Sequence, residues 1–142
     1  MNYKKFDDFV IGFKGTFTRK VTQKDNDLFR KLSGDENPLH FDEITAKKAG
    51  FDAKISNGFV TESRLAAALV KTFTSEKCAV VELKKNTRFL KPVFMNDEIT
   101  ATVEVIEKIE AMQALKIHAL CFNQNNEKVI ETYFIIQILS LQ

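Results

Sequence analysis

Cysteine, proline and glycine are scarce in this chain of 142 residues, which contains two, two and five of them, respectively. The two cysteines, Cys78 and Cys121, form no C-x-x-C motif, and no histidine lies at metal-ligand spacing from them. We therefore expect two buried free thiols, as in a protein of a reducing compartment. No stretch is rich in proline and glycine, and no segment is repeated. This predicts that residues 1–142 form a single domain without a linker.

Long apolar runs and a large charge of one sign are also missing. The net charge is +2, from 21 basic and 19 acidic side chains, which is too small an excess for the dense basic face that nucleic-acid binding requires. No window approaches the ~18 apolar residues of a membrane-spanning helix, and residues 1–18 lack the apolar stretch of a signal peptide. We expect a folded cytoplasmic protein with neither nucleic acid nor a membrane as a partner.

The first half of the chain carries the signals of helices joined by short loops. Thr22 is the N-cap expected for a helix over residues 23–32, and Gly34 follows as its C-terminal stop. Asp42 is the N-cap expected for a second, shorter helix that runs to Ala49 and is stopped by Gly50. These signals predict two short helices separated by a shaped loop.

A third helix is predicted over residues 58–73. No charged side chain occurs from Leu65 to Val70, and a helix that is apolar all round is buried on several sides. Its alanines would let another backbone approach closely. One face of this helix comprises Phe59, Ser63, Ala66, Ala67 and Val70.

The second half alternates apolar and polar residues with period two, which is typical of strands with one buried face. A short strand is also expected before the first helix. Successive strands with short links pair antiparallel. We therefore predict an α+β fold in which an antiparallel sheet curls around the buried third helix. The strands predicted in the second half cover residues 79–90, 99–105, 115–121 and 128–139.

Asp35 and His40 lie five residues apart on the loop between the first two helices. Pro38 makes this loop rigid and disfavours a helix at Asn37. A carboxylate and an imidazole that converge there can hold one water molecule, remove a proton from it and return a proton elsewhere. Histidine suits this task because its unperturbed pKa of ~6.5 lies near working pH. Spacing alone leaves the alternative that Asp35 closes an Asx turn and His40 is a surface residue.

Gly58 opens the third helix, where the backbone N–H groups have no partner within the helix and the helix dipole is positive. An N–H without a side chain in the way can approach a substrate carbonyl and stabilise negative charge on its oxygen. The alternative is that Gly58 is only an N-cap or turn glycine.

Residues 29–40, together with Ala46, resemble the hydratase-2 motif of the MaoC-like family, which contains the (R)-specific enoyl-CoA hydratases. The motif reads aromatic, spacer, aliphatic, small, G-D-x-N-P-aliphatic-H, five residues, then a small residue, and every fixed position is met. Residues 55–59 are similar to the family's I-x-H-G-M-like helix start, and residues 88–98 to its R-F-x-x-P-V-F-x-G-D-E segment. The resemblance covers about residues 15–138.

This resemblance implies the hot-dog fold, a homodimer with acyl tunnels near the subunit interface, and no metal or redox cofactor. Two departures from the family pattern are Asn57, which replaces a histidine, and Asn96, which replaces a glycine in a turn that asparagine tolerates. By matched position, the catalytic set is Asp35, His40 and Gly58, and the substrate-binding set is Asn37, Asn57 and Ser63.

The expected function is that of a hydro-lyase in fatty acid metabolism. It would hydrate trans-2-enoyl thioesters of CoA or acyl carrier protein with (R) specificity, or dehydrate (R)-3-hydroxyacyl thioesters. One alternative is a hot-dog acyl thioesterase, in which Glu62 on the third helix would matter more than Asp35. The other is a non-catalytic protein that binds acyl thioesters.

Overall fold

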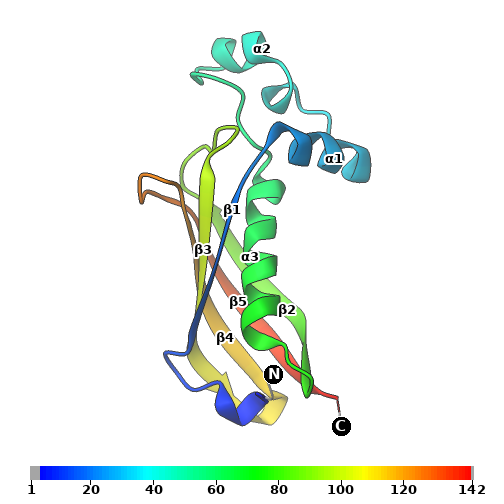
Figure 1. Ribbon diagram of the computed structural model, residues 1–142, viewed down its shortest axis with the longest axis vertical. Coiled ribbons are helices and arrows are strands. Elements are labelled where there is room, and N and C mark those ends of the chain that lie inside the picture. The colour runs from blue at the N-terminus through cyan, green and yellow to red at the C-terminus, as the bar shows by residue number, and fades with distance from the viewer. Residues whose placement is uncertain (1–3, 142) are drawn as a thin grey trace.

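The computed structural model describes residues 4–141 and has the hot-dog fold, an antiparallel five-stranded sheet packed along one long helix (Figure 1). This confirms the predicted α+β class. The strands are β1 (Lys14–Lys20), β2 (Cys78–Phe89), β3 (Glu98–Ile109), β4 (Ala114–Phe122) and β5 (Lys128–Ser140). The α-helices are α1 (Gln23–Ser33), α2 (Glu43–Lys48) and α3 (Gly58–Phe73), and the 3-10 helices are η1 (Phe6–Asp8), η2 (Pro38–His40) and η3 (Glu110–Met112).

The strand order in the sheet is β1-β3-β4-β5-β2. The prediction that successive strands pair is correct for β3 with β4 and for β4 with β5, but wrong for β2 and β3. Strand β2 pairs with β5 instead and forms one edge of the sheet. The connection between β2 and β3, residues 90–97, is not a tight hairpin because it contains Pro92 and because Phe94 forms a β-bridge with Ile55. It therefore crosses the end of the sheet.

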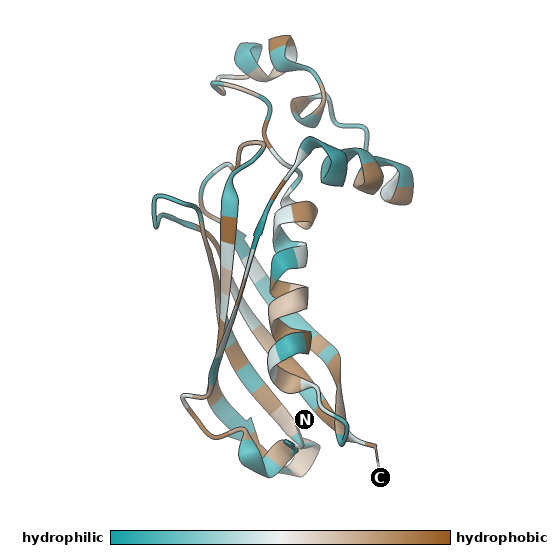
Figure 2. Ribbon diagram, viewed as in Figure 1, coloured by the Kyte–Doolittle hydropathy of each residue, from teal (hydrophilic) through white to brown (hydrophobic). Residues whose placement is uncertain are grey.

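The core lies between the concave face of the sheet and α3. Strands β3 and β4 alternate buried and partly exposed residues, as predicted. Figure 2 shows the corresponding alternation of hydrophobic and hydrophilic residues along the sheet. Leu65 and Leu69 of α3 pack into this core, and each such burial stabilises the fold by about 1.5–3 kcal/mol. Cys78 and Cys121 are buried and free, which confirms that prediction. Burial raises the pKa of the Cys121 thiol to about 12.

Helix α3 begins and ends at the predicted residues, but it is not buried on several sides. Phe59 and Val70 are 59% and 52% exposed, and Ser63 and Ala66 between them are exposed as well. The sheet covers only one side of the helix. The predicted small and apolar face therefore forms an exposed stripe on the single chain. No helix within residues 4–141 is long and apolar enough to cross a membrane.

Helices α1 and α2 lie beyond the N-terminal end of α3 (Figure 1). Their C-terminal ends lie within one residue of the predicted ones, and the predicted cap and stop residues are confirmed. Thr22 caps α1 by accepting a hydrogen bond from the Asp25 N–H, and the left-handed Gly34 ends it at φ 80°. Asp42 caps α2, and Gly50 follows that helix with φ 100°. The two helices enclose the loop that carries Asp35 and His40.

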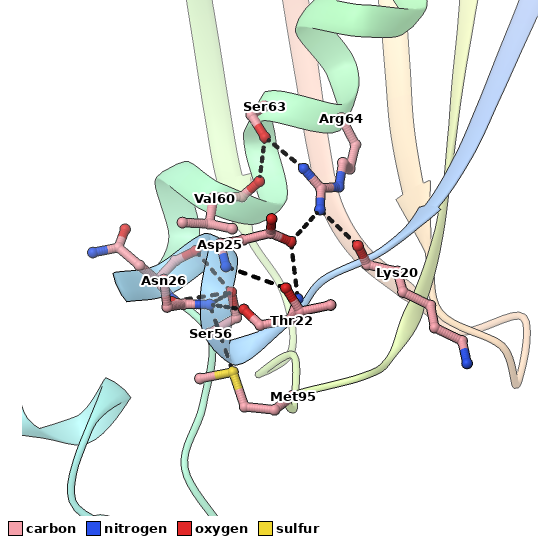
Figure 3. A network of polar contacts seen from close by, with 10 residues as sticks. Lys20, Thr22, Asp25, Asn26, Ser56, Val60, Ser63, Arg64 and Met95 are labelled. Atoms are coloured by element: carbon pink, nitrogen blue, oxygen red, sulfur yellow. Dashed lines mark hydrogen bonds and ion pairs between the residues drawn. The ribbon is translucent and has the colours of Figure 1, made fainter. Parts of the chain in front are cut away.

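A buried arginine on α3 ties α1 to the rest of the fold (Figure 3). Arg64 Nη2 donates to Asp25 Oδ2 on α1 at 2.8 Å and to the Lys20 carbonyl at the end of β1 at 2.6 Å. Asp25 in turn accepts a hydrogen bond from the Thr22 N–H. One side chain therefore fixes α1 relative to the first turns of α3.

Candidate active site

The loop between α1 and α2 is held by hydrogen bonds from its own side chains. Asp35 Oδ1 accepts a hydrogen bond from the Asn37 N–H at 3.1 Å, so the Asx turn considered from the sequence is present. Asn37 Oδ1 accepts from the Leu39 N–H at 3.2 Å, and the Asn37 carbonyl accepts from the His40 N–H at 3.1 Å. Asn37 therefore shapes the turn that presents Asp35 and His40.

His40 is not a surface residue, because its side chain is buried and fixed by a hydrogen bond. Its Nδ1 lies 2.8 Å from the Ile55 carbonyl oxygen. Since a carbonyl oxygen can only accept, Nδ1 must carry the proton, and Nε2 of the neutral ring is then an acceptor. This arrangement leaves Nε2 free to take a proton.

Asn57 connects the loop to α3. Its Nδ2 donates to Asp35 Oδ2 at 2.8 Å, while its Oδ1 caps α3 by accepting from the Phe59 N–H at 2.9 Å. The backbone of Asn57 is held by the buried Asn26 of α1, whose Oδ1 accepts from the Asn57 N–H at 2.8 Å. A single side chain therefore sets the position of the Asp35 carboxylate relative to the first turn of α3.

Hydrogen bonds keep Asp35 in its charged form. The Asn37 N–H makes the largest contribution to lowering the pKa of Asp35 below its usual value, and the hydrogen bond from the Asn57 amide acts in the same direction. Asp35 is therefore a carboxylate at neutral pH and can only accept hydrogen bonds.

Gly58 is the first residue of α3, and it does not have a positive φ. Among residues 4–141, no group accepts a hydrogen bond from its N–H, because the Asn57 side chain caps the next N–H along the helix. A Cβ at this position would lie 2.7 Å from Cε1 of Phe89. A side chain at this position would therefore have to displace the Phe89 ring, but it would not meet the strain of a left-handed turn.

A cavity of about 660 Å³ lies at the N-terminal end of α3. Asp35, His40 and Gly58 all line it, together with Asn37 and Asn57. Its other walls come from the loop after α2, the first turns of α3, β2 and the segment that follows β2. The site can therefore hold a water molecule between two acceptors, the Asp35 carboxylate and His40 Nε2. It can also hold a substrate carbonyl oxygen near the free N–H of Gly58. Within the described residues, no group of three or more His, Cys, Asp or Glu side chains could hold a metal ion.

The amino-acid sequence also matches a model of a known protein family. The family model described as a MaoC like domain matches residues 12–120, which is most of the chain. The chain belongs to the MaoC-like family.

Curated relatives of this MaoC-like protein include a mitochondrial 3-hydroxyacyl-[acyl-carrier-protein] dehydratase of Arabidopsis thaliana. It is 30% identical over 115 residues, which are 80% of this chain and 67% of the relative. An (R)-specific enoyl-CoA hydratase of Rhodospirillum rubrum is 25% identical over 116 residues, 82% and 79% of the two chains. An unliganded R-hydratase of Pseudomonas aeruginosa superposes with a TM-score of 0.83 at 25% identity, over 97% and 90% of the chains. With relatives named as hydratases and dehydratases, the chain is a hydro-lyase.

Ser63 is the one predicted site residue of this MaoC-like chain that does not line the cavity. It is exposed, donates to the Val60 carbonyl at 2.5 Å and accepts from Arg64 (Figure 3). An α-helix advances by about 100° per residue, so the fifth residue after Gly58 lies roughly 140° around the axis from it. Ser63 therefore faces away from the site in the single chain.

Glu62 does line the cavity, because the fourth residue after Gly58 lies only about 40° around the helix from it. The sequence offered Glu62 as a thioesterase carboxylate, but it gave no sign of its partners, Lys85 and Thr87. It also gave no sign of Asn26, because a buried asparagine in a helix rich in charged residues has no distinguishing pattern.

Proposed function

We propose that this protein hydrates trans-2-enoyl thioesters to (R)-3-hydroxyacyl thioesters, or catalyses the reverse dehydration. The observation that carries this proposal is that Asp35, His40 and the free Gly58 N–H line one cavity. The names of relatives at 25–30% identity support the thioester substrate and the (R) configuration. Both CoA and acyl carrier protein occur among these names, and both stay open as the carrier.

The Gly58 N–H is proposed to bind the thioester carbonyl oxygen. Attack of water on C3 moves the electrons of the double bond toward C1 and places negative charge on this oxygen. A fixed N–H donor at the positive end of α3 stabilises that enolate-like state more than it stabilises the substrate. The amide therefore acts mainly in the transition state.

Asp35 and His40 are proposed to hold the attacking water by accepting its two hydrogens. The Asp35 carboxylate and the unprotonated His40 Nε2 are both acceptors in the geometry described above. As the water oxygen bonds to C3, one of the two groups takes its proton, and the same proton, or one exchanged with it, is delivered to C2. One water is consumed, the C2–C3 double bond becomes single, and the pair returns to its starting state.

Incubation with crotonyl-CoA tests this function against its two alternatives. Loss of enoyl absorbance without release of free thiol is the expected result. Free thiol would instead indicate the thioesterase reaction, with Glu62 as the candidate carboxylate because it lines the same cavity. Binding without either change would indicate a non-catalytic thioester-binding protein.

A homodimer is also proposed, on two surface features. Strand β2 is an edge strand that leaves Val81 and Leu83 exposed, and unpaired edge groups favour pairing with a second strand. The second feature is the exposed stripe on α3, which includes Phe59 and Val70 and lies on the side of the helix that faces away from the sheet. Two-fold pairing would cover apolar surface of this kind. Sedimentation at micromolar concentration should give about twice the chain mass of 16.2 kDa, and a monomer at all concentrations would contradict the proposal.

Three expectations from the sequence stay as predictions. The first is a cytoplasmic location in fatty acid metabolism, and the second is the absence of a cofactor. The third is that residues 1–142 form one domain, of which residues 1–3 and 142 lie outside the described residues.

A further inference from the structure

An ion pair lies in the wall of the candidate active-site cavity. Glu62 Oε1 is 2.8 Å from Lys85 Nζ, and both residues line the cavity that Asp35 and His40 line. The Glu62 side chain is 8% exposed, whereas that of Lys85 is 44% exposed. The cavity wall therefore carries a charged pair where an alkyl chain would need apolar contacts.

Two threonines help to fix the position of the Glu62 carboxylate. Thr87 Oγ1 on β2 donates to Glu62 Oε1 at 2.9 Å, and the buried Thr132 on β5 lies 3.0 Å from Thr87 Oγ1. Because the Thr87 hydrogen is used on Glu62, Thr132 must be the donor of the second bond. The contacts from Thr87 and Lys85 both fall on Oε1, and within residues 4–141 no group donates to Oε2. One carboxylate oxygen therefore relies on water in the cavity.

A long acyl chain must pass the ion pair of Glu62 and Lys85. Of the residues that line the cavity, Leu90 and Lys91 after β2 are exposed, whereas Thr61, Glu62 and Ile130 are buried. The carrier group needs water, so the acyl tail points inward. Glu62 lies four residues beyond Gly58, or about 6 Å along the helix. With carbon–carbon bonds of about 1.5 Å, an extended chain advances roughly 1.3 Å per carbon and reaches that level about five carbons from the thioester carbonyl.

We propose that Glu62 and Lys85 make the site selective for short acyl groups of about four to six carbons, a conclusion that rests on the function proposed above. A longer alkyl chain would exclude water from Glu62 Oε2 and offer no donor in exchange. An unsatisfied buried acceptor is unfavourable, and a charged one more so. Crotonyl stops before the pair, whereas decenoyl must lie against it.

The test compares kcat/KM for crotonyl-CoA and trans-2-decenoyl-CoA, together with the affinities for butanoyl-CoA and decanoyl-CoA, which cannot be hydrated. The wild-type protein should favour the four-carbon substrate by roughly 10- to 100-fold, the range expected from one unsatisfied buried acceptor. The double variant Glu62→Leu/Lys85→Met should shift this ratio toward the ten-carbon substrate by a similar factor. Replacement of a buried ion pair by apolar side chains of similar size is commonly tolerated, so the variant should fold.

Lys84→Met is the matched control. Lys84 and Lys85 are neighbours on β2, and adjacent strand residues point to opposite faces of the sheet. Lys84→Met removes the same charge without changing the cavity wall, so it should leave the chain-length ratio unchanged.

The outcomes separate this inference from the proposed function. Wild-type protein that hydrates or binds ten-carbon thioesters as well as four-carbon ones would overturn the inference and leave hydration intact. A preference for butanoyl-CoA over decanoyl-CoA without any hydration would support the inference and reject the proposed reaction. An unchanged ratio in the folded double variant would also overturn the role of the pair.

Discussion

Replacement of Gly58 by alanine tests the backbone donor at the start of α3. The new Cβ would lie 2.7 Å from Cε1 of Phe89. Ordinary carbon–carbon contacts are about 3.5 Å, so the ring must retreat by about 0.8 Å. Phe89 is 58% exposed and can move without disturbing the core. Since Gly58 has no positive φ, alanine adds no backbone strain there.

The expected effect of Gly58→Ala is therefore on chemistry more than on folding. The methyl group and the displaced ring both intrude where the thioester oxygen would meet the N–H. Loss of one such donor typically lowers turnover by ~10²–10³, and we expect a loss in this range with a smaller rise in KM. Alanine lowers the entropy of the unfolded chain, which offsets the contact strain by about 0.4–1 kcal/mol. The Tm should change by only a few degrees, roughly the effect of 1 kcal/mol in a chain of this size.

Single-turnover hydration of crotonyl-CoA and a thermal melt on the same preparation measure the two effects separately. The double variant Gly58→Ala/Phe89→Leu serves as the control, because it relieves the contact with the ring. If it restores wild-type turnover, displacement of Phe89 and not the lost donor explains the defect. Wild-type turnover in folded Gly58→Ala would remove the Gly58 N–H from the mechanism.

Three further changes probe the site and its support. Asn57→Asp keeps a side-chain cap for α3 but replaces the donor to Asp35 by a second carboxylate, so the pKa of Asp35 should rise and the acid limb of the kcat/KM profile should move to higher pH. An acid limb at the same pH as in the wild-type protein would contradict the effect of Asn57 on the pKa of Asp35. Arg64→Met should lower the free energy of unfolding by about 2 kcal/mol and the Tm by roughly 4–8 °C, and a shift under about 1 °C would contradict its anchoring role. Cys78 and Cys121 should not react with a thiol reagent until the protein unfolds, whereas rapid labelling of the native protein would show an accessible thiol.

Local signals in the sequence were sufficient for the helix ends. Thr22, Gly34 and Asp42 act within a few residues of themselves, so cap and stop residues predict the same boundaries in any fold. The left-handed Asn96, with φ 72°, likewise occupies the turn position where the family pattern has glycine. Such features depend on the backbone conformation of a short segment.

Strand pairing was not predictable in the same way. Alternation of apolar and polar residues shows that β2 is a strand. It does not show whether β2 pairs with β3 or with β5, which is its partner in the structure. A bulge between Glu82 and Lys84 also shifts the faces of β2, so that Lys85 and Thr87 point toward α3. The ion pair in the cavity wall depends on that single extra residue.

The candidate site was predicted in its parts but not in its connections. The hydratase-2 motif gave Asp35 and His40, the start of the third helix gave Gly58, and the structure brings all three to one cavity. The hydrogen bond from Asn57 to Asp35 joins residues that lie 22 positions apart, and no sequence period reports such a contact. Ser63 was expected from its matched position, whereas helix geometry turns it away from the site.

The most direct test of the central claim is the rate of crotonyl-CoA hydration by Asp35→Asn and His40→Gln, with Glu62→Gln measured beside them. Asp35→Asn and His40→Gln approximately keep the size of the side chain. Because the shape of the loop depends mainly on Asn37, both variants should stay folded. Loss of a positioned acid or base should lower turnover at least ~100-fold in each of the first two variants, and Glu62→Gln should lower it much less. Near-normal turnover in both Asp35→Asn and His40→Gln would contradict the assignment of these residues as the pair that handles water.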